Sequence, residues 1–379
     1  MAVVGGGPAG CAAAAAASDG GATVVLLDPL ADPALGQAPR VGESAAPGTP
    51  RLIAEIFGSE ADTAFTADRH LRCPGTVSAW GTAQPTVTDH LLNPLGGAWN
   101  LDRRTFDDDL RRAVVRLGVE VRPAKLARVD REPGGWALAT PTGHPQRLWA
   151  DLVIDASGRG ARVARQLGAR QFHGDHLVAL WSLWQVDEAD QRASTYVESA
   201  EGGWWYSTLL PHARRVVAHL TDPDLLPTSG LARRDLILSA RALPLIGELL
   251  GAQGEATLAG EPRVTVARSS RLDLVVGPGW LATGDAAFTV DPLSGRGIVS
   301  ALLTGRAAGE AAVAMIDGNG QPGAPAYTRL MDDLHQDGFT RQTEAYEDEG
   351  RWPQAPFWLR RLRPKVARTL AGTVLEQAR

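Results

Sequence analysis

The first 28 residues place the strongest constraint on what this chain can fold into. A short apolar strand at 1–4 runs into Gly5-Gly6-Gly7-Pro8-Ala9-Gly10, a G-x-G-x-x-G pattern, and then into an alanine-rich helix at 11–18. A second strand at 22–27 ends at Asp28, 18 residues after Gly10. This order of strand, glycine loop, helix, strand and acid predicts a parallel α/β unit that binds a dinucleotide.

Each position of the pattern has a physical task. Gly5 permits the tight turn, Gly7 lets a pyrophosphate approach the backbone, and Gly10 lets the helix pack closely on the sheet. Pro8 and Ala9 of the loop are expected to contact the cofactor, and the free N–H groups at the start of the helix to bind the phosphates. Asp28 is expected to accept hydrogen bonds from ribose hydroxyls. The pattern alone fits NAD and FAD equally.

Composition narrows the class of protein. A chain of 379 residues can form two domains, or one with a large insert, and a net charge of −5 without a basic stripe argues against a nucleic-acid partner. The two cysteines, Cys11 and Cys73, predict no disulfide framework and favour the cytoplasm. We see no apolar run near the roughly 18 residues of a transmembrane segment. None of the eight histidines has a metal-binding spacing, so no metal is expected.

Three further segments follow in order. Arg40-Val41-Gly42-Glu43-Ser44 comes after the second strand, and Arg103 stands just ahead of an amphipathic helix. A later strand ends at Gly284-Asp285 and leads through a loop, from Pro292 to Gly297, into a helix of small residues.

Together these motifs resemble the flavin-dependent hydroxylase and halogenase superfamily, which implies that the cofactor is FAD. The resemblance implies that Asp285 contacts the ribityl and pyrophosphate part, that Arg103 reaches the phosphates, and that the 292–298 loop follows the edge of the isoalloxazine ring. Segment 151–169 is similar to the middle motif of the superfamily. Further expected FAD contacts are Arg40, Glu43, Ser44, Asp155, Gly158, Gly284, Pro292, Ser294, Gly295, Gly297 and Ile298.

The resemblance also implies the fold. We expect an α/β protein with an FAD-binding Rossmann-like domain of the p-hydroxybenzoate-hydroxylase type, an inserted antiparallel-sheet substrate domain and a helical C-terminus. The FAD-binding domain is expected to comprise 1–70, 99–170 and 262–316, and the substrate domain 71–98 and 171–261. Residues 317–379 are expected to form the C-terminal helical segment.

Two features separate the branches of the superfamily. Halogenases of this fold use a lysine downstream of the G-E-S segment, whereas this chain has only Lys125 and Lys365. The segments 70–81, 203–211, 284–298 and 349–361 are similar to the flavoprotein monooxygenases that mature tryptophylquinone enzymes by oxygenating a tryptophan in another polypeptide. That resemblance implies hydroxylation of an indole in a peptide or protein, through a flavin C4a-hydroperoxide formed with O₂.

Other functions stay open beside this one. The same fold serves halogenases and prenyl or alkene reductases, and a flavoprotein can act as a non-catalytic maturation factor. We find no second dinucleotide pattern, so either NAD(P)H reduces the flavin directly or a separate flavin reductase supplies the electrons.

A strand at 203–211 carries three large rings. Because side chains alternate along a strand, Trp204 and Tyr206 share one face and Trp205 points to the other. We expect the face with Trp204 and Tyr206 to cover the substrate, with Ser78 and Trp80 of a neighbouring strand as further contacts. The candidate catalytic residues are Glu43, His70, Trp204 and Tyr206. For Glu43 an acid or base role and a loop-capping role both remain open, and His70 could face the pocket or cap a loop at the surface.

The C-terminal stretch 351–370 combines large apolar residues with six basic ones. Two interpretations remain open: a helix packed on the body with its arginines in water, or a docking site for an acidic polypeptide.

Overall fold

The computed structural model describes residues 1–32, 40–41, 43–61, 65–90, 92–141, 147–251, 256–318 and 323–362. Gly42, Lys365 and the end of the basic C-terminal stretch lie outside these residues. The predicted class, an α/β protein with an antiparallel sheet and a helical C-terminal region, is confirmed.

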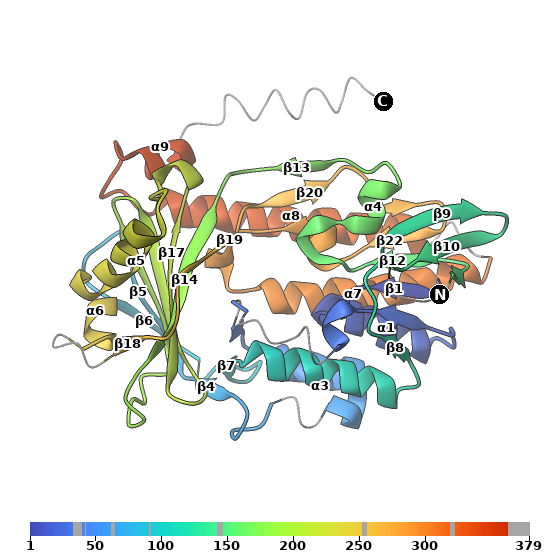
Figure 1. The fold of residues 1–379 in the computed structure, drawn as a ribbon, viewed down its shortest axis with the longest axis horizontal. Coiled ribbons are helices and arrows are strands. Elements are labelled where there is room, and N and C mark those ends of the chain that lie inside the picture. Colours follow the sequence, from blue (N-terminus) through green and yellow to red (C-terminus); the bar gives the residue numbers. More distant parts are fainter. Residues whose placement is uncertain are drawn as a thin grey trace.

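A six-stranded sheet at one end of the molecule contains the predicted nucleotide-binding unit (Figure 1). Its central strands are parallel, and Val3 of the first strand pairs with Ile154 on one side and Leu26 on the other. In sheet order the strands are β21 (Val276–Gly277), β22 (Trp280–Ala282), β12 (Val153–Asp155), β1 (Ala2–Val4), β2 (Val25–Leu27) and β8 (Glu120–Arg122).

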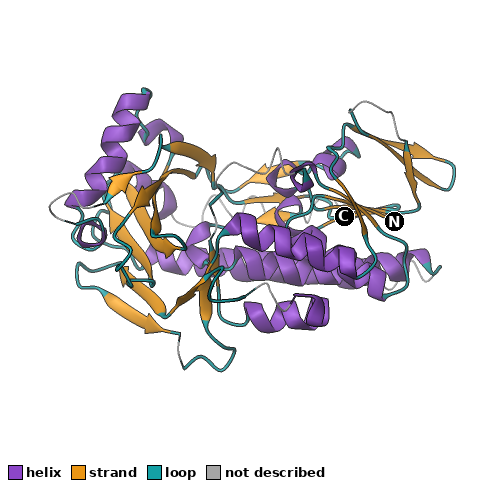
Figure 2. Cartoon of the chain, turned by 60° about the horizontal axis from the view of Figure 1, so that its bottom comes forward, coloured by secondary structure: helices purple, strands orange, loops and turns teal. Residues whose placement is uncertain are grey.

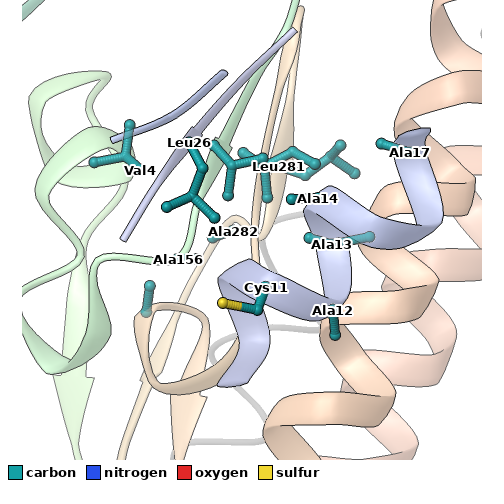
Figure 3. Close-up of a cluster of buried hydrophobic side chains, with 14 of the residues drawn as sticks. Val4, Cys11, Ala12, Ala13, Ala14, Ala17, Leu26, Ala156, Leu281 and Ala282 are labelled. Carbon is teal, nitrogen blue, oxygen red and sulfur yellow. The ribbon is translucent and has the colours of Figure 1, made fainter. Parts of the chain in front are cut away.

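Helix α1 (Pro8–Asp19) lies between this sheet and α7 (Gly297–Ile316), and its small residues keep the layer thin (Figure 3). A Cβ at Gly305 would collide with the carbonyl oxygen of Ala9, and one at Gly309 with that of Ala13. Glycine at both positions therefore lets the two helices touch through their backbones. By length and composition α7 is also the one helix of the described residues that is apolar enough to cross a membrane, but here it belongs to the core.

The remaining helices of this half complete its core. They are α2 (Thr49–Phe57), α3 (Arg103–Arg116) and α4 (Arg162–Gln166). One small antiparallel sheet contains β3 (Ser44–Ala45), β7 (Ala98–Asn100) and β4 (Leu71–Cys73), and a second contains β9 (Arg128–Glu132), β10 (Gly135–Ala139) and β11 (Leu148–Ala150). A third contains β13 (Gln171–His173), β20 (Ser270–Leu272) and β23 (Phe288–Thr289).

An eight-stranded sheet forms the other end of the molecule, as Figures 1 and 2 show. Its strands are β18 (Thr257–Leu258), β14 (Val178–Gln185), β17 (Arg214–Thr221), β16 (Gly203–Leu210), β15 (Thr195–Ala200), β5 (Gly75–Ala79) and β6 (Thr86–Asp89), with β19 (Arg263–Val266) also paired to β14. One face packs against α5 (Gly230–Leu238) and α6 (Ile246–Leu249). The domain boundaries inferred from the sequence stay predictions.

Helix α8 (Gly323–Glu347) runs along the molecule and contacts both large sheets (Figure 1). Near its start the Tyr327 hydroxyl donates to the carbonyl of Ala282 in β22, 2.7 Å away. Near its end the carbonyl of Ala345 accepts from the indole of Trp80, 2.6 Å away, next to β5. The short helix α9 (Pro356–Leu362) follows and packs on the eight-stranded sheet.

The basic residues of this C-terminal stretch are engaged within the chain. Arg360 pairs with Asp222 and Asp224, and Arg361 pairs with Asp222 at 2.8 Å. The described part of the stretch therefore packs on the body, as one of the two interpretations expected. Its arginines bind carboxylates of the same chain instead of facing only water.

Candidate flavin and substrate site

The glycine loop has the shape that a pyrophosphate needs. A Cβ at Gly5 would collide with the carbonyl of Ala156, and one at Gly10 with the carbonyl of Gly5. In contrast, a Cβ at Gly7 would meet no atom within 4 Å. The loop is therefore packed tightly from behind and open at Gly7, where α1 begins with its free N–H groups. An anionic phosphate fits this open side.

Asp28 lies beside this loop, and one residue that sequence reasoning missed, Arg111, lies with it. A Cβ on Gly6 would come 2.5 Å from Oδ2 of Asp28, so this middle glycine is needed for the acid to approach. Arg111 of α3 donates to the same Oδ2 at 2.9 Å and to the carbonyl of Gly6 at 3.3 Å. Arg111 therefore fastens α3 to the loop. No local pattern marks it, because it stands among other arginines 83 residues from Asp28.

Arg40, a predicted FAD contact, and Arg103, the predicted phosphate ligand, are brought together by one buried carboxylate. Asp107 accepts from Arg40 at 2.5 Å and from Arg103 at 3.1 Å. The group lies on α3 one turn before Arg111, which donates to the carbonyl of Gly6 in the glycine loop. Burial raises the pKa of the nearby Cys11 thiol, Arg111 opposes this rise and Asp107 adds to it. Two guanidinium groups near the helix start suit a pyrophosphate.

Asp155 has a different immediate task from the one expected. Its carboxylate accepts from the backbone N–H groups of Ser157, Val163 and Ala164 at 3.0, 2.9 and 2.8 Å. The bonds from Val163 and Ala164 satisfy free donors in the first turn of α4, and the bond from Ser157 fixes the turn before it. Burial raises the pKa of this carboxyl, and the three bonds oppose the rise. The structure thus uses Asp155 to fix the turn that contains Gly158.

Asp285 is the more exposed of the two acids. It lies next to Gly284, where a Cβ would come 2.6 Å from the Cβ of Ala9 in α1. Its carboxylate is 3.5 Å from Nε of Arg159, the residue after Gly158. The middle motif and the 284–298 segment therefore meet beside the first helix.

The predicted ring-edge loop consists of a 3₁₀ turn, Pro292–Ser294, and the start of α7. A Cβ at Gly295 or Gly297 would meet no atom within 4 Å, which leaves room for a flat group to approach; Ile298 is buried behind them. Asp291, which the sequence analysis did not single out, begins the loop by accepting from the N–H of Leu293 at 2.9 Å. Burial raises the pKa of Asp291 to about 6.

The aromatic strand lies across the G-E-S segment. The hydroxyl of Tyr206 in β16 is 3.0 Å from the hydroxyl of Ser44. Burial raises the pKa of Tyr206 well above its usual range, and the carboxylate of Glu43 adds to this shift. Val41, Tyr206 and Leu293 all pack against the same apolar cluster. The sheet, the G-E-S segment and the ring-edge loop therefore converge.

The rings of β16 alternate as predicted. Trp205 stacks on His219 with ring centroids 4.4 Å apart, on the face covered by α5 and α6. Trp204 is 1% exposed, and its ring packs edge to face with Trp80 on the opposite face. Trp204 and Trp80 are thus packed under α8, whereas Tyr206 remains partly exposed.

Ser78 lies in line with Tyr206. Ser78 of β5 pairs with Val197 of β15, and Val197 pairs with Tyr206 of β16. Directly paired residues share a face of the sheet. Ser78 is also partly exposed, so it stays a candidate substrate contact.

His70 lies at the start of α3. It is buried between Phe65 and Phe106, and its Nδ1 accepts from the N–H of Asp102, the residue that caps α3, at 3.1 Å. The structure therefore places His70 against the residue that caps α3. Glu43, Ser44 and Tyr206 form a separate group, in which Tyr206 contacts Ser44 and is affected by the charge of Glu43.

The comparisons with known proteins agree with this geometry. A family model described as tryptophan halogenase matches residues 76–215. An FAD-dependent oxidoreductase of Marinomonas mediterranea, LodB, is 27% identical, with 95% of each chain covered. Among solved structures, the peptidyl tryptophan dihydroxylase QhpG, essential for tryptophylquinone cofactor biogenesis, is 25% identical with a TM-score of 0.77, covering 95% of this chain and 77% of its own. The flavin-dependent halogenase CmlS shares the fold at a TM-score of 0.82 and 22% identity, covering 99% of this chain and 69% of its own.

Proposed function

We propose that this FAD-dependent oxidoreductase, a homologue of the flavin-dependent halogenases and hydroxylases, is a monooxygenase that hydroxylates an aromatic ring, the indole of a tryptophan in a peptide or protein. The observation that carries the proposal is the contact between Tyr206 and Ser44. It supports a site in which one face of the eight-stranded sheet closes over the G-E-S segment and the ring-edge loop.

The residues described above fit FAD. In the proposal, the start of α1 with Gly7 binds the phosphates, Arg40 and Arg103 neutralise them, and Asp285 contacts the ribityl chain. The open side of Gly295 and Gly297 receives the ring edge. Bound FAD, once reduced, supplies with O₂ an electrophilic oxygen atom; one oxygen enters the ring and the other leaves as water.

The chain's own residues orient the ring and exclude water. An indole is already nucleophilic, so the site does not need a strong base to activate it. Tyr206 suits this task because its raised pKa keeps its hydroxyl neutral, able to donate or accept a hydrogen bond, over the whole working range of pH. The apolar cluster around it excludes water that would divert the oxidant.

The lysine content favours oxygenation over halogenation. Within the described residues Lys125 is the only lysine, and it is exposed in the connection from β8, the edge strand of the parallel sheet, to β9. Electrons come from NAD(P)H, directly or through a separate flavin reductase.

The thiols of Cys11 and Cys73 are buried and form no disulfide, which supports a cytoplasmic location.

Mass spectrometry after reaction with labelled oxygen tests the proposal. The holoenzyme, reduced chemically to bypass the electron donor, is mixed with ¹⁸O₂, bromide and a tryptophan-containing peptide. We expect labelled oxygen on the indole and no bromine. Brominated peptide, or unmodified peptide despite full flavin reoxidation, would contradict hydroxylation.

A matched pair of variants locates the reaction. Tyr206→Phe removes the hydroxyl that faces Ser44, so we expect product per reoxidised flavin to fall by about tenfold. Tyr196→Phe removes a hydroxyl from β15, on the opposite face of the same sheet, and we expect it to leave that ratio unchanged. Equal effects of the two substitutions would mean that the reacting ring does not lie against the Tyr206 face of the sheet.

A further inference from the structure

A buried chain of hydrogen bonds connects the aromatic strand to the ring-edge loop. The indole Nε1 of Trp204 donates to the hydroxyl of Tyr346 in α8, 3.0 Å away. That hydroxyl donates to Oδ2 of Asp291, 2.8 Å away. The other oxygen of Asp291 accepts from the N–H of Leu293. The chain therefore begins on β16, crosses the end of α8 and ends at the first turn of the loop.

All three side chains are almost fully withdrawn from water. Trp204, Tyr346 and Asp291 are 1–2% exposed. A buried carboxylate is costly unless hydrogen bonds satisfy it, so Asp291 is strongly held in the arrangement in which both of its oxygens are bonded. Moving Tyr346 would break one of these bonds with no water at hand to replace it.

Three other charged or polar side chains of the described residues act on Asp291. Gln342 of α8 approaches Oδ2 at 3.5 Å. The charge of Asp175 raises the pKa of Asp291, and Arg361 of α9 lowers it; Arg361 itself is paired with Asp222. Tyr346 is therefore the main hydrogen-bond donor that reaches Asp291 from the half of the molecule that contains the aromatic strand.

The same strand contains the proposed substrate contact. Trp204 and Tyr206 lie two residues apart on one face of β16, so a displacement of Tyr206 along or away from the sheet is carried to Trp204 through a stiff extended backbone. Bonds at 3.0 and 2.8 Å then carry it to Asp291. A change at the substrate face thus reaches the loop through these hydrogen bonds as well as through the apolar cluster that both contact.

We propose that Trp204, Tyr346 and Asp291 form a positioning chain, in which the aromatic strand holds the 291–298 loop in its flavin-facing arrangement. The inference deepens the proposed function and rests on it for the place of the flavin ring. These residues act through the loop and do not themselves react. When a bound aromatic substrate holds β16 in place, the loop keeps its arrangement and the oxidant is best protected from water.

The spectrum of bound FAD tests the chain without any substrate. Tyr346→Phe keeps the ring and removes the hydroxyl that joins Trp204 to Asp291. We expect a shift of the visible absorption bands of bound FAD, together with about threefold or more peroxide released per reoxidised flavin. With peptide present, kcat for hydroxylation falls while KM stays within about twofold. Asp291→Asn and Trp204→Phe are expected to change the spectrum in the same way.

Tyr327→Phe is the matched control. It also removes a buried hydroxyl from α8, but one that donates to Ala282, away from the chain. We expect its FAD spectrum to equal that of the wild type. If Tyr346→Phe and Tyr327→Phe give the same spectrum, the positioning chain is refuted.

Two further readouts separate the possible results. Combining Trp204→Phe with Tyr346→Phe should change the spectrum no more than Tyr346→Phe alone, because both break one chain; additive changes would refute it. Hydrogen exchange of 291–298 in the flavin-free protein should quicken in Tyr346→Phe and stay unchanged in Tyr327→Phe. Both readouts work without turnover, so they test the positioning chain even in a protein that hydroxylates no peptide. Failure to hydroxylate any peptide would refute the proposed function alone.

Discussion

Among the four glycines of the first loop, Gly7 alone has open space where its side chain would be. Its backbone is extended, with φ −78° and ψ −176°, so a larger residue can occupy the position without strain. We therefore predict that Gly7→Leu folds with near-wild-type stability and yet binds FAD about 100-fold more weakly, because the new side chain fills the space of the pyrophosphate. Titration of the flavin-free protein with FAD, followed by fluorescence, measures this.

Gly230→Leu is the control for that prediction. Gly230 begins α5 at the far end of the molecule, and a Cβ there also meets no atom within 4 Å. It should bind FAD as the wild type does. Tight FAD binding by Gly7→Leu would show that the phosphates do not bind at the start of α1.

At the scale of elements, the contact between α1 and α7 determines where the glycine loop lies. Gly309→Ala would bring a methyl group into collision with the carbonyl of Ala13. We predict a loss of about 1–3 kcal/mol in the free energy of unfolding, because the backbones must move apart. Urea denaturation of the flavin-free protein measures it.

The sign of this effect separates packing from helix propensity. Alanine is favoured over glycine in helices by about 1 kcal/mol. Gly230→Ala, with open space around it, should therefore be neutral or slightly stabilising. A stabilised Gly309→Ala variant would mean that the helices do not touch through their backbones.

At the scale of the whole molecule, Glu349 joins the C-terminal segment to the eight-stranded sheet. Its carboxylate accepts from the N–H of Gly81 at 2.7 Å, from the hydroxyl of Ser199 at 2.5 Å and from Arg351. Burial alone would raise its pKa, but the bonds from Arg351 and Ser199 lower the pKa of Glu349 to about 2.

This pKa gives a pH-dependent stability. Folding lowers the pKa of Glu349 from its ordinary value of 4.5 to about 2. The stabilisation is therefore complete above about pH 4.5 and is lost as the pH falls toward 2. Glu349→Gln should therefore cost up to about 3 kcal/mol at neutral pH, with a difference from wild type that shrinks below pH 4.5. Denaturation at several pH values tests this, with the exposed Glu347→Gln as the neutral control; a difference that stays constant with pH would contradict it.

Local patterns in the sequence predicted the parts of the molecule that obey local rules. The glycine loop, the alternation of Trp204 and Trp205, and the strand, loop and helix around Asp285 follow from spacing and residue type. The use of Asp155 as a helix cap was not predicted, because a buried acid in a glycine-rich turn can serve a ligand or a helix equally well.

Contacts between distant segments were beyond local patterns. Trp204 and Tyr346 are 142 residues apart, and Tyr346 and Asp291 are 55 apart, so no spacing rule connects them. The same is true of Arg361 with Asp222, which lie in segments that meet only in the folded chain. The sequence therefore predicted a flavin-binding protein, and the hydrogen-bonded link between its two halves became visible only in the structure.

The position of α8 also has a consequence for the order in which the protein is made. A ribosome completes both large sheets before it synthesises the helix that bonds to each of them. Until α8 is made, the two halves lack the hydrogen bonds through Tyr327 and Ala345, and the rings of Trp80 and Trp204 lack their cover. A chaperone that shields these aromatic rings would therefore have its greatest effect before residues 323–347 have been synthesised.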